Sequence, residues 1–198
     1  MDSQLTLVNP TPPVTLTFST DSMNNATLFA GARPAYAIST QLQGSTTEIR
    51  KAGTAELVAR IARREILPNT IVFPDVNGGR EIKLSKWLRR CKQPDGLRVH
   101  VIDTEVGQCL LRQHRIYRLA LFTEFDLETP VAHWDRVDGQ SPLSLVLYSG
   151  TENFHPQIIA AFIIEELRMR MAEKADTVAQ GRAAATGTPL ASLGHGAH

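Results

Sequence analysis

Residues 158–164 read Ile-Ile-Ala-Ala-Phe-Ile-Ile and are apolar at every position. A helix made of such a run has no polar face, so it has to be enclosed by protein or lipid. Seven residues rise only about 10 Å, far short of the ~20 residues that span a bilayer. A buried strand is the alternative, but the pattern continues through Leu167, Met169 and Met171 with strong helix formers between them. We therefore predict a helix at about residues 156–174 that is enclosed by protein.

Most of the chain before this helix alternates apolar and polar residues at the period of a strand. Leu16 and Phe18 alternate with threonine and serine, and Leu143, Leu145 and Leu147 form a similar run near the other end. Turn residues such as Asn-Gly-Gly and Asp-Gly separate the runs. Many short strands joined by turns indicate an antiparallel sandwich or barrel. A closed barrel has no exposed edges and needs a filled lumen, so we expect a mostly β fold, a closed antiparallel barrel around the C-terminal hydrophobic helix.

Residues 54–67 fit two structures. Leu57, Val58, Ile61 and Ala62 stand at helical spacing, with Thr54 as an N-cap, which slightly favours a helix. The strands expected on both sides favour an extended segment instead. The pattern alone leaves both structures open.

Composition and the chain ends suggest one domain with two tails. A length of 198 residues and an apolar content of 42% fit a single globular domain, which we place at residues 14–174. Proline and threonine predict a disordered arm at 1–13, and alanine, glycine and threonine predict a disordered tail at 175–198. Two cysteines are too few for a disulfide framework, and the first residues lack a signal peptide. We expect a soluble, cytoplasmic protein, peripheral at membranes at most.

The order of these segments resembles a known family. An Asn-Gly-Gly turn is followed by GLRVHVIDTEVGQ, then PLSLVLYSG, then the closing IIAAFIIEELRMRM. Over residues 14–174 this resembles a domain of unknown function common in mushroom-forming fungi, which is similar to the tubby and LURP-one class. The resemblance implies a roughly twelve-stranded barrel around a buried C-terminal helix, and a strand at residues 56–66. It also implies a link to anionic lipid, because tubby-like barrels bind phosphoinositides and related scramblase-type domains act at membranes.

A basic segment at residues 80–98 is the best candidate for a binding site. Leu84, Trp87, Leu88 and Cys91 follow helical spacing, so a helix here presents one apolar and one cationic face. Such a helix lies on anionic lipid with Trp at the level of the headgroups. The alternative is a solvated rim with Trp87 packed on the barrel. The residues expected to contact the ligand are Lys83, Lys86, Trp87, Arg89, Arg90 and Lys92.

The sequence offers no catalytic or metal-binding pattern. Histidines are scattered without a paired spacing, and no nucleophile elbow, phosphate-binding loop or dinucleotide motif is present. We therefore expect no cofactor, no metal and no catalytic residue. A net charge of +1 gives no reason to expect a nucleic acid partner. Three functions stay open: a non-catalytic barrel that binds an anionic ligand such as a phosphoinositide or membrane surface, an intracellular protein-interaction module, and an enzyme of unrecognised type.

Overall fold

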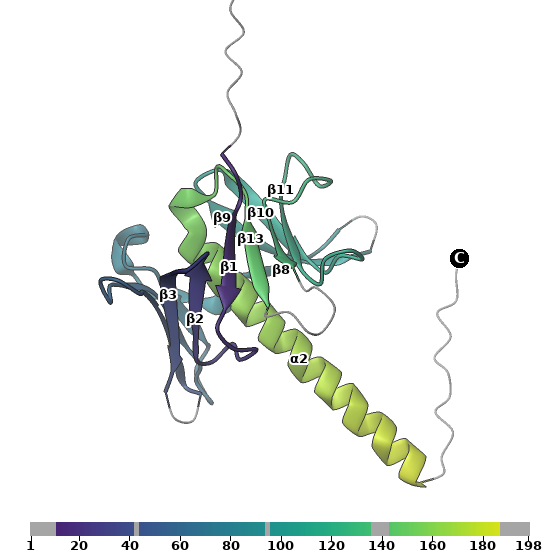
Figure 1. The fold of residues 1–198 in the computed structure, drawn as a ribbon. Coiled ribbons are helices and arrows are strands. Elements are labelled where there is room, and N and C mark those ends of the chain that lie inside the picture. Colours follow the sequence, from purple (N-terminus) through teal and green to yellow (C-terminus); the bar gives the residue numbers. More distant parts are fainter. Residues whose placement is uncertain (1–10, 42–43, 94–95, 136–142, 187–198) are drawn as a thin grey trace, which may run out of the picture. The chain divides into compact units, whose positions relative to one another are not determined.

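The computed structural model describes residues 11–41, 44–93, 96–135 and 143–186. Within these residues thirteen strands form one antiparallel sheet in the order β7-β6-β5-β4-β3-β2-β1-β13-β12-β11-β10-β9-β8 (Figure 1). Consecutive strands therefore pair with each other, apart from β7 and β8, and β1 pairs in addition with β13. The strands are β1 (Val14–Phe18), β2 (Ala26–Ala30), β3 (Arg33–Thr40), β4 (Thr46–Lys51), β5 (Leu57–Ala62), β6 (Thr70–Val72), β7 (Ile82–Lys83), β8 (Arg89–Lys92), β9 (Arg98–Thr104), β10 (Gly107–Arg112), β11 (Ala120–Thr123), β12 (Ala132–Asp135) and β13 (Ser144–Leu147).

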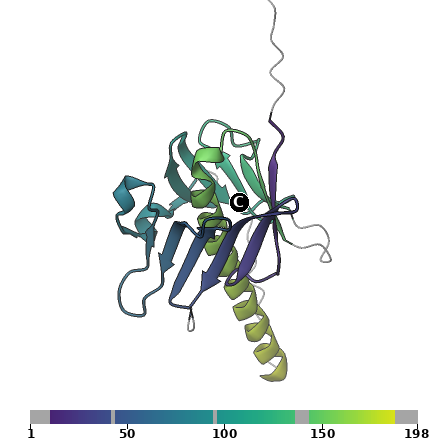
Figure 2. The ribbon, with the colours of Figure 1, turned by 60° about the vertical axis from the view of Figure 1, so that its left-hand side comes forward.

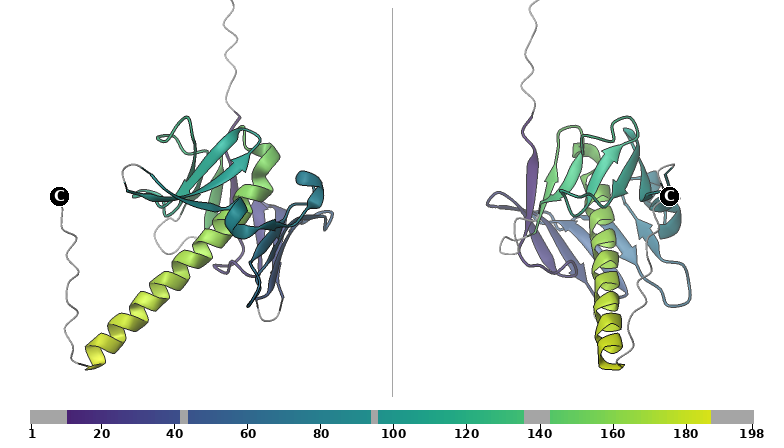
Figure 3. Two further views of the ribbon diagram at one scale, coloured as in Figure 1. Left: turned by 180° about the vertical axis from the view of Figure 1, so that it is seen from behind. Right: turned by 90° about the vertical axis from the view of Figure 1, so that its right-hand side faces the viewer.

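The β1–β13 pairing explains how one sheet encloses a helix. It joins the first strand to the last, with Leu16 opposite Leu145. The two halves of the sheet, β1 to β7 and β8 to β13, are therefore hydrogen-bonded into one sheet. Strands from the two halves lie on either side of the first turns of helix α2 (His155–Thr186) (Figure 2; Figure 3 from behind and from the side). The expected mostly β fold with one C-terminal helix is confirmed.

The apolar run at the start of α2 is enclosed, as predicted. Every residue from Ile158 to Ile163 is fully buried. The ring of Phe162 meets that of Trp134 on β12 edge-on, with centroids 5.3 Å apart, and Trp134 meets Phe18 on β1 at the same distance. This three-ring cluster packs α2 against β1 and β12. Burying such aromatic rings supplies a large share of the stability of a core.

The chain divides into two compact units, residues 1–163 and residues 164–198. In the second unit α2 runs on to Thr186, so the part of the predicted tail from 175 to 186 is helical. Alanine, glutamine and arginine in this stretch are strong helix formers, which explains the added turns. Residues 187–198 of that tail, and 1–10 of the predicted arm, lie outside the described residues. Within the described part of the chain, no helix is long and apolar enough to cross a membrane.

The ambiguous segment at residues 54–67 contains a strand, β5 (Leu57–Ala62), and no helix. β5 pairs with β4 on one side and β6 on the other. On β5, Ala59 lies opposite Ile49 and Leu57 lies opposite the next residue of β4, Arg50. Val58 therefore has no partner on β4 and forms a β-bulge. A bulge of this kind lets neighbouring residues face the same way, and Val58 and Ala59 are both buried. The strand implied by the family resemblance is therefore confirmed here.

The two ends of the sheet, β7 and β8, are not paired with each other among the described residues. They are consecutive in the chain and are joined by the four-residue helix α1 (Leu84–Trp87). The expected barrel is thus a strongly curved antiparallel sheet whose hydrogen-bond ladder stays open at this one place. The two strands at this place are short, with two residues in β7 and four in β8.

Candidate functional site

The basic segment is not one amphipathic helix, so that part of the sequence interpretation is wrong. Residues 82–92 form β7, α1 and β8 in turn. Antiparallel pairing with β6 and β9 supplies hydrogen bonds and burial that a short surface helix lacks, and it overrides the helical spacing of the apolar residues. Alternation along β8 then places Arg89 and Arg90 on opposite faces.

Trp87 belongs to the core. Only 8% of its surface is exposed, and its ring lies against that of Phe73 with centroids 5.1 Å apart. Leu84 and Leu88 beside it are also buried. The indole is therefore a packing residue, as in the alternative weighed from the sequence, and it does not stand at the surface as a membrane anchor.

A cleft of about 760 Å³ opens beside α1. Its lining comes from the loop after β6, from β7 and α1, from Asp103 on β9 and from Gln157 on the first turn of α2. The cleft thus has β7 on one side and β9 on the other, at the place where the ladder is not closed. The lining residues are Phe73, Val76, Asn77, Arg80, Glu81, Ile82, Lys83, Lys86, Trp87, Asp103 and Gln157.

The loop that forms one wall has an unusual backbone. Asn77, Gly78 and Gly79 all have positive φ angles, of 53°, 65° and 69°. Glycine adopts this left-handed region freely, and asparagine does so more readily than most residues. The Asn-Gly-Gly turn predicted from the sequence therefore lies in the connection between the paired strands β6 and β7, and it directs the chain so that Asn77 and Arg80 reach the cleft.

The charges of the cleft do not cancel. Its two carboxylates already have partners: Glu81 accepts from Arg64 Nη2 at 2.6 Å and also from Thr70 Oγ1, and Asp103 accepts from Arg89 Nη2 at 2.8 Å. Its three cations, Arg80, Lys83 and Lys86, form no ion pair among the residues that the structure describes. The local balance therefore favours an anion.

Gln157 adds a polar group at the inner side of the cleft. The residue is 5% exposed, and its Oε1 has no hydrogen-bond partner in the described part of the chain. A buried carbonyl oxygen without a donor costs roughly 1–3 kcal/mol. The cleft thus contains an acceptor that a water molecule or a ligand hydroxyl would satisfy after a small side-chain movement.

The six residues predicted to bind the ligand separate into distinct places. Lys83 and Lys86 line the cleft, and Trp87 forms its wall from the core. Arg89 is held by Asp103, while Arg90 and Lys92 lie on the other face of β8. The other lining residues of the cleft are outside the predicted set, among them Arg80, which is part of the basic segment, and Gln157, which is far away in sequence. Only the tertiary structure brings Gln157 next to α1.

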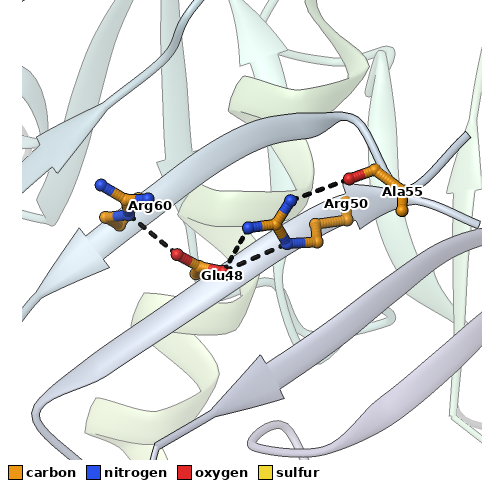
Figure 4. Close-up of polar contacts among 4 residues, drawn as sticks. All are labelled: Glu48, Arg50, Ala55 and Arg60. Atoms are coloured by element: carbon orange, nitrogen blue, oxygen red, sulfur yellow. Dashed lines mark hydrogen bonds and ion pairs between the residues drawn. The ribbon is translucent and has the colours of Figure 1, made fainter.

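A second charged cluster lies on the outer face of β4 and β5 (Figure 4). The carboxylate of Glu48 accepts from Arg50 Nη2 at 2.8 Å and from Arg60 Nε at 2.9 Å. Arg50 Nη1 also donates to the carbonyl oxygen of Ala55 at 2.8 Å. Hydrogen bonds from Arg50 are the main cause that lowers the pKa of Glu48. Because these donors and acceptors satisfy each other, this cluster is structural and offers little to a ligand.

Histidines and aromatic rings gather over β11 and β12. His133 is 6% exposed, and its ring lies 3.9 Å from that of Tyr117 and 5.7 Å from that of Tyr148, centroid to centroid. Burial lowers the pKa of His133. No three His, Cys, Asp or Glu side chains within the described residues are placed to hold a metal ion. This cluster therefore packs one face of the sheet.

Comparison with known proteins adds a family and a distant structural neighbour. No curated protein matches the chain. An X-ray structure of a protein from Arabidopsis thaliana is similar, with 8% sequence identity, a TM-score of 0.44, and coverage of 77% of this chain and 91% of that chain. Residues 21–171 match the model of a family described as "Family of unknown function (DUF6593)", a range that contains β2 to β13 and the first half of α2. The chain belongs to this family of unknown function.

Proposed function

We propose that the protein is a non-catalytic binding protein whose cleft beside α1 takes an anionic ligand, with phosphate as the group recognised. The observation that carries the proposal is the position of Arg80, Lys83 and Lys86. These cations line one cleft and have no ion-pair partner among the described residues, whereas Glu81 and Asp103 are each held by an arginine.

The charge arrangement supports phosphate binding for an energetic reason. Three like charges around one cleft repel each other, and an anion placed among them relieves that repulsion. A cation close to an anionic lipid surface contributes about 1 kcal/mol, so three together give moderate, salt-sensitive affinity. Lysine binds phosphate as a point charge, and arginine adds a fork of donors.

The proposal includes a tubby-like barrel as the architecture. In this view the unpaired edges β7 and β8 leave a lateral opening, and the cleft lies beside it, lined by β7, α1 and Asp103 of β9. The sheet otherwise forms a continuous ladder from β7 to β8. The ligand is either the headgroup of a phosphoinositide in a membrane or a free phosphate ester, because both present the same group to the cations.

Binding is tested with the full chain against two probes. One is vesicles of phosphatidylcholine with 5% phosphatidylinositol bisphosphate, and the other is soluble inositol trisphosphate, each titrated at low and at high salt. We expect the triple variant Arg80→Ala, Lys83→Ala and Lys86→Ala to bind roughly 100-fold more weakly, as the loss of about 1 kcal/mol per cation implies. Wild-type binding should weaken as salt rises.

The matched control removes three other exposed cations, Arg90, Lys92 and Arg98, and should leave the affinity of both probes unchanged. Binding to vesicles alone assigns the ligand to a membrane, and equal binding to both probes assigns it to the phosphate headgroup itself. If the wild type binds neither probe, or if both triple variants lose the same affinity, the cleft is not an anion site.

A further inference from the structure

The outermost strand of the sheet, β8, has a free edge at two residues. Among the described residues, β8 pairs with β9 and with no other strand. The amide of Gln93 donates to the carbonyl oxygen of Leu97 at 2.8 Å. In an antiparallel pair every second residue forms hydrogen bonds to the partner strand, so Cys91 and Arg89 are the next residues of β8 that bond to β9. The backbone groups of Arg90 and Lys92 therefore point away from β9. A strand edge of this kind is a template for another extended chain.

The same two residues carry an unbalanced charge. Lys92 lies directly opposite Arg98 on β9, and Arg90 lies directly opposite His100. Like charges opposite each other destabilise a pair of strands. Arg90, Lys92 and Arg98 are exposed and form no ion pair among the described residues. Within the part of the chain that the structure describes, no carboxylate therefore pairs with the facing cations Lys92 and Arg98.

We propose that β8 is a docking edge for an extended acidic peptide segment of another protein, which adds as a further strand with acidic residues at alternate positions. Alternation follows from strand geometry, because Arg90 and Lys92 share one face and Arg89 and Cys91 the other. Acidic residues at positions i and i+2 of the peptide meet Arg90 and Lys92 on that face. Small or apolar residues between them meet Cys91, which is also exposed.

The coincidence of free backbone groups and cations favours a peptide over other anionic macromolecules. A membrane or a nucleic acid uses the cations alone and does not need the outward backbone groups of Arg90 and Lys92. A peptide strand uses both, with the backbone supplying affinity and the side chains supplying specificity. The cations also repel basic edges, which protects β8 from non-specific pairing.

The test uses the full chain and fluorescently labelled, end-blocked peptides of eight residues. One peptide alternates glutamate with threonine, a second has the same composition with its glutamates contiguous, and a third has lysine in place of glutamate. In fluorescence anisotropy, we expect the alternating peptide to bind at least 10-fold more tightly than the contiguous one. The double variant Arg90→Glu and Lys92→Glu should lose that binding at least 10-fold and bind the lysine peptide instead.

Two further measurements separate this edge from the cleft. The variant Lys83→Ala with Lys86→Ala should bind the alternating peptide like the wild type, whatever its effect on phosphate probes. Hydrogen exchange at the amides of Arg90 and Lys92 should slow when the peptide is bound. Equal affinity for the alternating and contiguous peptides, or unchanged exchange at both amides, would mean electrostatic adsorption only and would overturn the proposal.

Discussion

The ring of Trp87 lies against the ring of Phe73, with centroids 5.1 Å apart and an angle of 52° between their planes. Phe73 follows β6 and Trp87 ends α1, so this contact fastens the link between the two sheet edges to the strand region beside it. Both rings also line the cleft. The hydrophobic core and the candidate binding site therefore share one wall.

Trp87→Ala tests this assignment through stability. Removing a buried aromatic side chain leaves a cavity, and we expect a loss of ~3–5 kcal/mol in the free energy of unfolding, measured by urea denaturation. Lys86→Ala, the neighbouring exposed residue, should change stability by less than about 0.5 kcal/mol. If the Trp87→Ala protein is as stable as the Lys86→Ala protein, the assignment of Trp87 to the core is wrong.

Phe162→Ala tests the enclosed helix. Phe162 is fully buried and contacts Trp134 edge-on, so we expect a loss of ~3–5 kcal/mol, a large part of the ~5–15 kcal/mol typical of a domain. The matched control, Met171→Ala, removes an exposed side chain of the same helix and should have little effect. Equal thermal midpoints for the two variants would contradict enclosure of the helix.

Glu48 should stabilise the sheet only while it is ionised. Arg50 and Arg60 lower its pKa, so its contribution is complete above the ordinary glutamate pKa of about 4.3 and disappears as pH falls through the lowered value. Both arginines are substantially exposed, so Glu48→Gln should cost only about 1 kcal/mol at pH 7.

The checks on Glu48 are the pH dependence and a second glutamate. The difference between wild type and Glu48→Gln should shrink at pH 3 in parallel urea titrations. Glu56→Gln breaks an exposed pair with Lys51 and should cost a few tenths of a kcal/mol. A Glu48→Gln cost that stays constant from pH 7 to pH 3 would show that ionisation is irrelevant.

Buried His133 should make the protein less stable in mild acid. Burial lowers its pKa below the ordinary value of about 6.5, so the unfolded chain binds a proton before the folded one does. The free energy of unfolding should therefore fall as pH drops below about 6.5, by at most about 1.4 kcal/mol per pH unit for one such group.

Comparing His133→Phe with wild type at pH 7.5 and pH 5.5 isolates this group. The variant should keep the aromatic packing against Tyr117 and lose part of the decline in stability. Burial also lowers the pKa of His155. This second histidine should account for the part of the decline in stability that remains in the variant. An unchanged decline in His133→Phe would assign the effect to other groups.

The sequence by itself determined the enclosed helix and the strands whose residues alternate clearly. A helix without a polar face at residues 158–164 has to be enclosed, and alternating residues such as Leu16 and Phe18 have to lie on a half-buried strand. These are local consequences of period and polarity, so they needed no knowledge of distant residues. The family resemblance added a strand at residues 56–66, and β5 confirms it over Leu57–Ala62.

Only the tertiary structure decided the borderline segments and the site. The helical spacing from Leu84 to Cys91 produced only the single turn α1. The flanking residues form β7 and β8, because pairing with β6 and β9 outweighs a weak local preference for helix. The cleft required Arg80, Asp103 and Gln157 to meet, and these residues are brought together by the order of the strands and the path of α2. Which charges are neutralised depends on such long-range contacts, as the Arg89–Asp103 pair shows, and no pattern along the chain records them.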